Sequence, residues 1–330
     1  MDTASALMGM VPWESDPEGE VVYLCRVGGS RFTEPFFDNS LDLLAPIGQS
    51  QTAKLTFPEL REAVGLDVPS PRALVFHTGR CGSTLLTRML AHDRAVLSVS
   101  EPGSVSTIHR DAIADAARAD ADRQAIADLM VLFDRFAAGR RQRPVFKLSS
   151  WETPDCASVV ALAPDVPLIF VHRPVAEVVA SLVSGLPAWA KWLTPETPGL
   201  RDHAAHVAQL SADAPTEEFF AALWASSVAA VLGLTSRTLF VSYADLVGQP
   251  AETLAAVAQH IGLTESWSNG TATTELRYYA KSLDPSEPFD PEERHARAPL
   301  SPDALERVLD VVGDLPDTLA ERTETSMRQS

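Results

Sequence analysis

From Pro71 onward, short runs of apolar residues alternate with longer stretches that have the apolar period of a helix. This alternation is typical of a parallel sheet in which a helix follows each strand. We therefore expect an α/β fold with a central parallel sheet flanked by helices. The expected strands, in chain order, are residues 73–77, 96–99, 145–148, 168–171 and 238–241.

Residues 1–70 lack this alternation, and we expect them to form a small N-terminal extension. The segment is acidic and contains prolines at first, which predicts irregular structure with one short strand at residues 21–25. The segment that ends in Phe36 and Phe37 indicates packing against a larger body. The division that follows is an extension at 1–70 and an α/β domain at 71–330.

The charge balance restricts the classes of partner. The chain has 27 Lys and Arg against 44 Asp and Glu, a formal net charge of −17. Affinity for nucleic acids comes largely from Lys and Arg that neutralise phosphates, so this balance argues against a nucleic-acid partner. An anionic ligand would need a local cluster of positive groups, which is feasible because salt screens surface charges beyond about 8 Å.

The sequence shows no targeting signal. No basic segment followed by a long apolar run stands near the first residue, and the apolar-rich stretch around 221–234 is too short to span a bilayer. Cys25, Cys81 and Cys156 are widely spaced, without a metal-ligand or disulfide pattern, which suits a reducing compartment. We expect a cytoplasmic protein without membrane association or a bound metal, and the sequence leaves homo-oligomerisation open.

The loop after the first expected strand, with the sequence HTGRCGSTLL, is the most informative segment. Gly79 and Gly82 allow a tight turn and the close approach of a ligand. Ser83 and Thr84 begin the next helix, whose N-terminus favours an anion, and Arg80 adds a charged donor. The segment predicts an anion site, but its glycine spacing and lack of a following Lys exclude a Walker A loop. The alternative is a simple turn capped by Ser83, with Arg80 in solvent.

A second positive group follows the fourth expected strand. Arg173 comes directly after this strand, Pro174 suits the first helical position, and Glu177 offsets the helix dipole. Ser181 lies off the apolar face of that helix. Because ligands bind beyond the carboxyl ends of parallel strands, we expect Arg173 near Arg80. An ordinary helix start with a surface Arg is the alternative.

The loop residues resemble a motif of the sulfotransferase family. The sequence RCGSTLL, which starts at Arg80, is similar to the family's loop for the 5′-phosphosulfate of 3′-phosphoadenosine 5′-phosphosulfate (PAPS). The family usually has Pro at the position of Gly79 and Ser at the position of Cys81. By this resemblance the cofactor-binding loop residues are Gly79, Arg80, Cys81, Gly82, Ser83 and Thr84.

Two further segments extend the resemblance over roughly residues 72–285. Arg173 and Ser181 have the separation of the family's pair that holds the 3′-phosphate, and Tyr243 matches a strand-end tyrosine near the adenosine. Lys281, with Arg277, stands where the family has a basic segment that closes over the cofactor. The resemblance implies a three-layer P-loop-like domain that binds PAPS.

The implied reaction is transfer of a sulfuryl group to a hydroxyl of a small-molecule or carbohydrate acceptor. Lys147 matches the family's strand-end Lys, and together with Arg80 it would stabilise charge on the leaving phosphate. Many cytosolic members have a catalytic His two residues later, where this chain has Ser149. Glu101, after the second strand, is therefore the candidate base, as in tyrosylprotein sulfotransferases. A partly dry pocket would raise its pKa toward neutrality.

Two other functions stay open at this point. A non-catalytic nucleotide-binding protein of the same fold is consistent with Ser149 and with the unexplained extension. A P-loop-type kinase would need a Walker Lys and a strand-end Asp for magnesium, and neither stands at the required position.

Overall fold

The structure is a computed structural model of the chain. It describes residues 7, 9–28, 31–48, 52–193, 198–234, 237–263, 275–276, 281–282, 284, 287–288 and 299–329. Arg277, named above with Lys281, lies outside the described residues.

The centre of the fold is a five-stranded parallel sheet with the order β5-β6-β4-β7-β8. All five expected strands are present, which confirms the α/β class. The third strand starts two residues earlier than expected and ends at Lys147. The strands are β4 (Ala73–His77), β5 (Val96–Ser100), β6 (Arg143–Lys147), β7 (Leu168–His172) and β8 (Thr238–Ser242).

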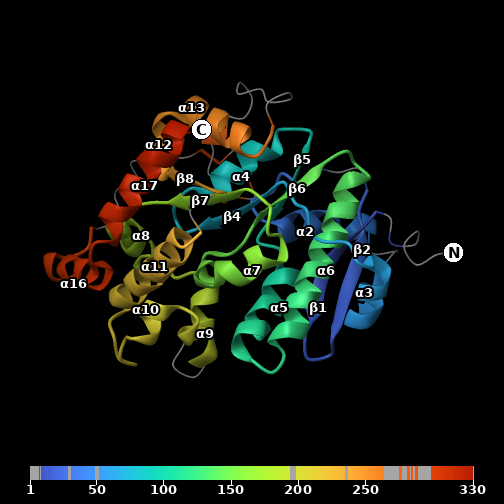
Figure 1. The fold of residues 1–330 in the computed structure, drawn as a ribbon, viewed down its shortest axis with the longest axis horizontal. Coiled ribbons are helices and arrows are strands. Elements are labelled where there is room, and N and C mark those ends of the chain that lie inside the picture. The colour runs from blue at the N-terminus through green and yellow to red at the C-terminus, as the bar shows by residue number, and fades with distance from the viewer. Residues whose placement is uncertain are drawn as a thin grey trace.

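Helices cover both faces of the sheet, because the strands carry apolar, buried side chains on both faces. In β4, Leu74 and Phe76 belong to one hydrophobic cluster, while Ala73 and Val75 belong to another on the opposite face. Figure 1 shows α4 and α13 above the sheet and α7 and α11 below it. These helices are α4 (Ser83–Ala91), α7 (Cys156–Leu162), α11 (Thr216–Leu232) and α13 (Pro250–His260).

Further helices complete the layers. None of the described helices is long and apolar enough to cross a membrane. They are α5 (Gly103–Ala114), α6 (Ala119–Ala138), η1 (Ser150–Asp155), α8 (Val175–Val183), η2 (Ala188–Trp192), α9 (Pro198–Asp202), α10 (Ala205–Ala208), α12 (Tyr243–Gly248), α16 (Pro302–Val312) and α17 (Leu315–Gln329).

The expectation of an irregular N-terminal extension is wrong. The extension forms a three-stranded antiparallel sheet in the order β1-β2-β3. A short helix follows the third strand, and a capping box between Thr56 and Glu59 stabilises its N-terminus. Sequence pattern missed β1 and β3 because a bulge interrupts β1 and the side chains of β3 are mostly solvent-accessible. The elements are β1 (Met10–Asp16), β2 (Val21–Arg26), α2 (Phe37–Gly48), β3 (Thr52–Thr56) and α3 (Phe57–Val64).

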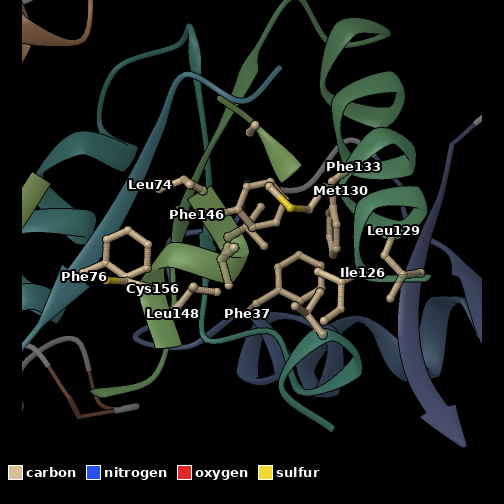
Figure 2. Close-up of a cluster of buried hydrophobic side chains, with 14 of the residues drawn as sticks. Phe37, Leu74, Phe76, Ile126, Leu129, Met130, Phe133, Phe146, Leu148 and Cys156 are labelled. Carbon is tan, nitrogen blue, oxygen red and sulfur yellow. The ribbon is translucent and has the colours of Figure 1, made fainter. Parts of the chain in front are cut away.

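The extension shares a hydrophobic cluster with the central sheet. The ring of Phe37 stacks on Phe32 at 5.1 Å and meets Phe133 of α6 edge-on at 5.2 Å. Phe133 in turn packs against Phe146 of β6. Figure 2 shows Phe37, Phe133 and Phe146 in one cluster of buried side chains. This packing fixes residues 32–38 beside the carboxyl end of the sheet.

Candidate functional site

The loop between β4 and α4 turns through left-handed backbone. Gly79, Arg80 and Gly82 have φ values of 77°, 50° and 83°. Gly82 is the N-cap of α4 and no side chain caps the helix, so the predicted alternative of a turn capped by Ser83 does not occur. The first N–H groups of α4 have no acceptor within the helix and suit an anion. A Cβ atom on Gly82 would lie 2.9 Å from the ring of Tyr243, so this position accepts only glycine without rearrangement.

Arg80 and Arg173 lie side by side. Nη2 of Arg80 donates to the carbonyl of Gly185 at 2.8 Å, and Nη1 of Arg173 donates to the carbonyl of Arg80 at 3.4 Å. Arg80 is half-buried, which contradicts the alternative of an Arg in solvent. The structure thus places two guanidinium groups from separate strand ends at one edge of the sheet.

Several contacts orient Arg173. Its guanidinium forms an ion pair with Glu177 at 2.5 Å and lies 4.5 Å from the ring centroid of Tyr243. Its backbone carbonyl accepts a hydrogen bond from Nε1 of Trp224 at 3.1 Å. Ser181 is buried on α8, further along the helix that begins after Arg173. These contacts hold the guanidinium over an aromatic face.

Lys147, at the end of β6, connects two parts of the site. Its side chain is fully buried. Its Nζ donates to Oγ1 of Thr84 in the first turn of α4, at 3.4 Å, and it also forms an ion pair with Glu101. One ammonium group therefore bridges the anion loop and the carboxylate after β5.

Glu101 is held in a strained backbone conformation with a φ of 50°. Its Oε2 accepts a hydrogen bond from Oγ of Ser149 at 3.0 Å, and its Oε1 lies 3.7 Å from Nε2 of His77. Burial raises the pKa of Glu101, but the charges of Lys147 and other nearby groups outweigh burial and lower the pKa to about 2. The expectation of a pKa raised toward neutrality is therefore wrong, since a buried counter-ion contacts this carboxylate.

His77 adds a neutral imidazole to the site. Its Nδ1 accepts the N–H of Gly79 at 3.1 Å, which leaves Nε2 protonated and facing the carbonyl of Leu148 at 2.9 Å. Burial, followed by the charge of Lys147, lowers the pKa of His77 to about 3. The ring therefore stays uncharged at neutral pH and connects the anion loop to the β6 strand end.

Lys281 reaches the same cluster from the C-terminal part of the chain. Burial lowers the pKa of its ammonium to about 8, and neighbouring charges include Glu101, Lys147 and Arg80. The ring of Phe36 lies 5.2 Å from Nζ of Lys147 and 5.8 Å from Nζ of Lys281. The site thus gathers two ammonium groups and one aromatic ring around Glu101.

Sequence reasoning missed the contribution of the extension. Phe36 covers the two lysines, and the carboxylate of Asp38 accepts the N–H of Gly103 at 3.2 Å, at the start of α5. Burial, opposed by this hydrogen bond, raises the pKa of Asp38 to about 6. The aromatic pair of Phe36 and Phe37 was the available signal, but sequence alone did not show which ring faces the site.

The structure brings the predicted residues together at the carboxyl edge of the sheet. One side chain departs from the expectation: Sγ of Cys81 points to the carbonyl of Val171 at 3.1 Å and is fully buried. Burial raises the pKa of this thiol. The side chain of Cys81 is therefore not available to a ligand in the loop.

The fold and this edge define a P-loop-like α/β protein whose loop after β4 contains two glycines and no Walker Lys. A model of the sulfotransferase family matches residues 73–269, which is more than half of the chain. The chain belongs to the sulfotransferase family and is an enzyme of that family.

Solved structures of sulfotransferases are similar to this chain at low identity. STF9 from Mycobacterium avium has 13% identity and a TM-score of 0.47, covering 85% of this chain and 82% of its own. The sulfotransferase domain of the Synechococcus PCC 7002 olefin synthase has 19% identity and a TM-score of 0.44, covering 77% and 96%. The domain from the curacin biosynthetic pathway has 17% identity and a TM-score of 0.46, covering 74% and 97%. No curated protein matches the sequence.

Proposed function

We propose that this enzyme transfers a sulfuryl group from PAPS to a hydroxyl of a small-molecule or carbohydrate acceptor. The observation that carries the proposal is the position of Lys147, whose Nζ contacts both Thr84 of the anion loop and the Glu101 carboxylate. A donor phosphate held by the loop and an acceptor hydroxyl beside the carboxylate would meet at this ammonium group.

The residues present fit a nucleotide with phosphates at both ends of its ribose. Arg80, Thr84 and the N-terminus of α4 offer charged and polar donors for the 5′ side, and the left-handed Gly82 keeps the loop open to it. Arg173, with Ser181, would hold the 3′-phosphate, and Tyr243 would contact the adenosine. When bound, PAPS supplies an activated sulfuryl group and leaves as adenosine 3′,5′-bisphosphate.

Glu101 would act as the base. It takes the proton from the acceptor hydroxyl while the hydroxyl oxygen forms a bond to sulfur and the bond from sulfur to the 5′-phosphate oxygen breaks. Lys147 and Arg80 stabilise the negative charge that builds up on that phosphate oxygen. Lys281 adds a third positive group near the same place.

The low pKa of Glu101 has a role in this scheme. While Lys147 contacts the carboxylate, Glu101 is ionised but weakly basic. Once the ammonium of Lys147 turns toward a bound phosphate, the attraction that lowers the pKa weakens, while burial, which raises it, persists. Loading of the donor would thus strengthen the base at the moment it is needed.

The setting of the reaction is part of the proposal. The three cysteines are free thiols in the structure, which supports a reducing compartment such as the cytoplasm. We assign residues 1–70 to the acceptor side, since Phe36 and Asp38 come from that extension and lie beside Lys147 and Glu101. The α/β domain at 71–330 carries the donor side.

Calorimetry tests donor binding. The protein should bind adenosine 3′,5′-bisphosphate without metal and more tightly than ATP with magnesium. Arg173→Ala should weaken binding at least about tenfold, because hydrogen bonds to charged groups contribute about 1.5–3 kcal/mol. Arg237→Ala is the matched control, since that Arg precedes β8 and donates to the carbonyl of Val166. Equal affinity of wild type and Arg173→Ala would refute the assignment, and preference for ATP with magnesium would favour a kinase.

Turnover of labelled PAPS over a panel of hydroxyl-bearing acceptors tests catalysis. Glu101→Gln should retain affinity for the bisphosphate and lose transfer. If wild type binds the bisphosphate and transfers to none of the phenols, alcohols and sugars, the protein is a non-catalytic nucleotide binder. If Glu101→Gln transfers at the wild-type rate, another group is the base.

A further inference from the structure

A buried histidine lies between two carboxylates behind the site. His109 is on α5, while Glu152 and Asp155 are on η1. Nδ1 of His109 is 3.1 Å from Oε1 of Glu152, and Nε2 is 2.9 Å from Oδ2 of Asp155. The side chains of His109 and Glu152 are 2% and 0% exposed. The function proposed above uses none of these three groups.

The geometry fixes the charge of this histidine. Both ring nitrogens face carboxylate oxygens, which only accept hydrogen bonds, so both nitrogens must donate and the ring is an imidazolium. Burial lowers the pKa of His109, but the bonds to Asp155 and Glu152 outweigh burial and raise it to about 9. His203, beyond the end of α9, also faces the cluster, and burial lowers its pKa.

Glu152 connects His109 to the turn after β6. Its Oε1 is held by His109. Its Oε2 accepts hydrogen bonds from the backbone N–H of Ser149 at 2.5 Å and from the hydroxyl of Ser106 at 3.2 Å. The carboxylate thereby ties the turn after β6 to helix α5. Without a positive partner, this fully buried carboxylate would lose its compensation and the turn would relax.

Ser149 completes the connection. Its Oγ donates to Oε2 of Glu101 at 3.0 Å, on the carboxylate oxygen that Lys147 does not contact. A continuous series of hydrogen bonds therefore runs from Asp155 through His109, Glu152 and Ser149 to Glu101. Ser149 occupies the place of the histidine expected from the family, and here it serves to orient the carboxylate.

We propose that His109 is a positioning residue for Glu101 and that it acts through Glu152 and Ser149. The inference rests on the proposed function of Glu101 as the base. Ion pairing in the cluster keeps the turn after β6 in place, and the turn keeps the carboxylate aimed at the acceptor.

The test is a kinetic cycle with His109→Gln, Ser149→Ala and the double variant. His109→Gln should lower kcat about ten- to a hundredfold while KM for PAPS and affinity for the bisphosphate stay the same. The double variant should be no slower than Ser149→Ala, because both changes break one connection. His203→Gln is the control, since that ring faces two backbone carbonyls of the same region. A kcat of His109→Gln within about twofold of wild type, or additive effects in the cycle, would overturn the inference.

A second variant covers the case in which His109→Gln does not fold. Asp155 is 28% exposed, so Asp155→Asn should fold and lower the pKa of His109. The alkaline fall of kcat should then begin at lower pH than in wild type and in the control Asp111→Asn. Lys281 titrates in all three proteins and does not distinguish them. Coincident profiles would argue against the inference.

A readout without turnover separates this inference from the proposed function. NMR of the Glu101 carboxyl carbon should show a higher pKa in Asp155→Asn or His109→Gln than in wild type, because the Ser149 hydrogen bond stabilises the ionised form. An unchanged Glu101 titration overturns the positioning role. A shifted titration in a protein that transfers no sulfuryl group keeps the connection and rejects only the proposed reaction.

Discussion

Replacement of Lys147 by Met removes the charge that compensates Glu101 while keeping an unbranched side chain. The Lys147 side chain is fully buried, and the Glu101 carboxylate is 19% exposed. The pair and its surroundings hold the pKa of Glu101 at about 2, against 4.5 for a free Glu. At about 1.4 kcal/mol per pKa unit, this difference corresponds to about 3 kcal/mol. Breaking a buried ion pair costs about 3–5 kcal/mol, so Lys147→Met should lose about 3 kcal/mol of stability near neutral pH.

The sign of the pH dependence follows from the direction of the shift. Because the folded-state pKa of Glu101 lies below its unfolded value, the pair stabilises the fold above 4.5 and the stabilisation falls as pH drops toward 2. The free energies of unfolding of wild type and Lys147→Met should therefore differ most near pH 7 and converge in acid. Urea unfolding at about pH 7 and about pH 4 measures both differences.

A double variant separates stability from catalysis. Adding Glu101→Gln to Lys147→Met removes the uncompensated carboxylate and should restore most of the lost stability without restoring transfer. A Lys147→Met protein as stable as wild type near pH 7 would refute the reasoning. So would a double variant as unstable as the single one.

Three other expectations follow from the structure. Gly82→Ala should lower the free energy of unfolding by about 1–2 kcal/mol and weaken binding of the bisphosphate, because φ is 83° and the new Cβ would meet Tyr243. Thermal unfolding and calorimetry measure the two effects, and Gly248→Ala, with open space around it, is the control. Phe36→Ala should raise KM for the acceptor and leave affinity for the bisphosphate unchanged, and an altered bisphosphate affinity would contradict the acceptor-side assignment. Because the pKa of His109 is raised from 6.5 to about 9, its stabilisation is complete below 6.5 and is lost as pH rises through 9. The Tm of wild type should therefore fall between pH 6.5 and 9, and this fall should be missing in His109→Gln. Parallel plots of Tm against pH for the two proteins would contradict the raised pKa of His109.

The parts of the fold that sequence predicts are those in which burial alone decides the pattern. Strands buried on both faces, such as β4 and β7, appear as continuous apolar runs, and the sequence therefore places them within a residue or two. The small antiparallel sheet was missed because β3 alternates between exposed and half-buried residues without a strong apolar side. Its order depends on pairing with β2, which local pattern does not encode.

The candidate site divides in the same way. Arg80, Lys147 and Arg173 were predictable because parallel strands bring their carboxyl ends to one edge. The ionisation of Glu101 was predicted in the wrong direction, because the sequence does not show that Lys147 is buried against it. The connection through His109 depends on the packing of α5 against η1, which brings His109 to Glu152, 43 positions away along the chain.

The left-handed backbone at Arg80 has a consequence for laboratory evolution. A side chain at positive φ costs about 1–3 kcal/mol, so glycine at this position would relieve strain and remove a charge that the proposed reaction requires. Selection for heat resistance alone would favour this replacement and enrich stable, inactive proteins. Libraries built on this scaffold therefore need a screen for product formation in every round.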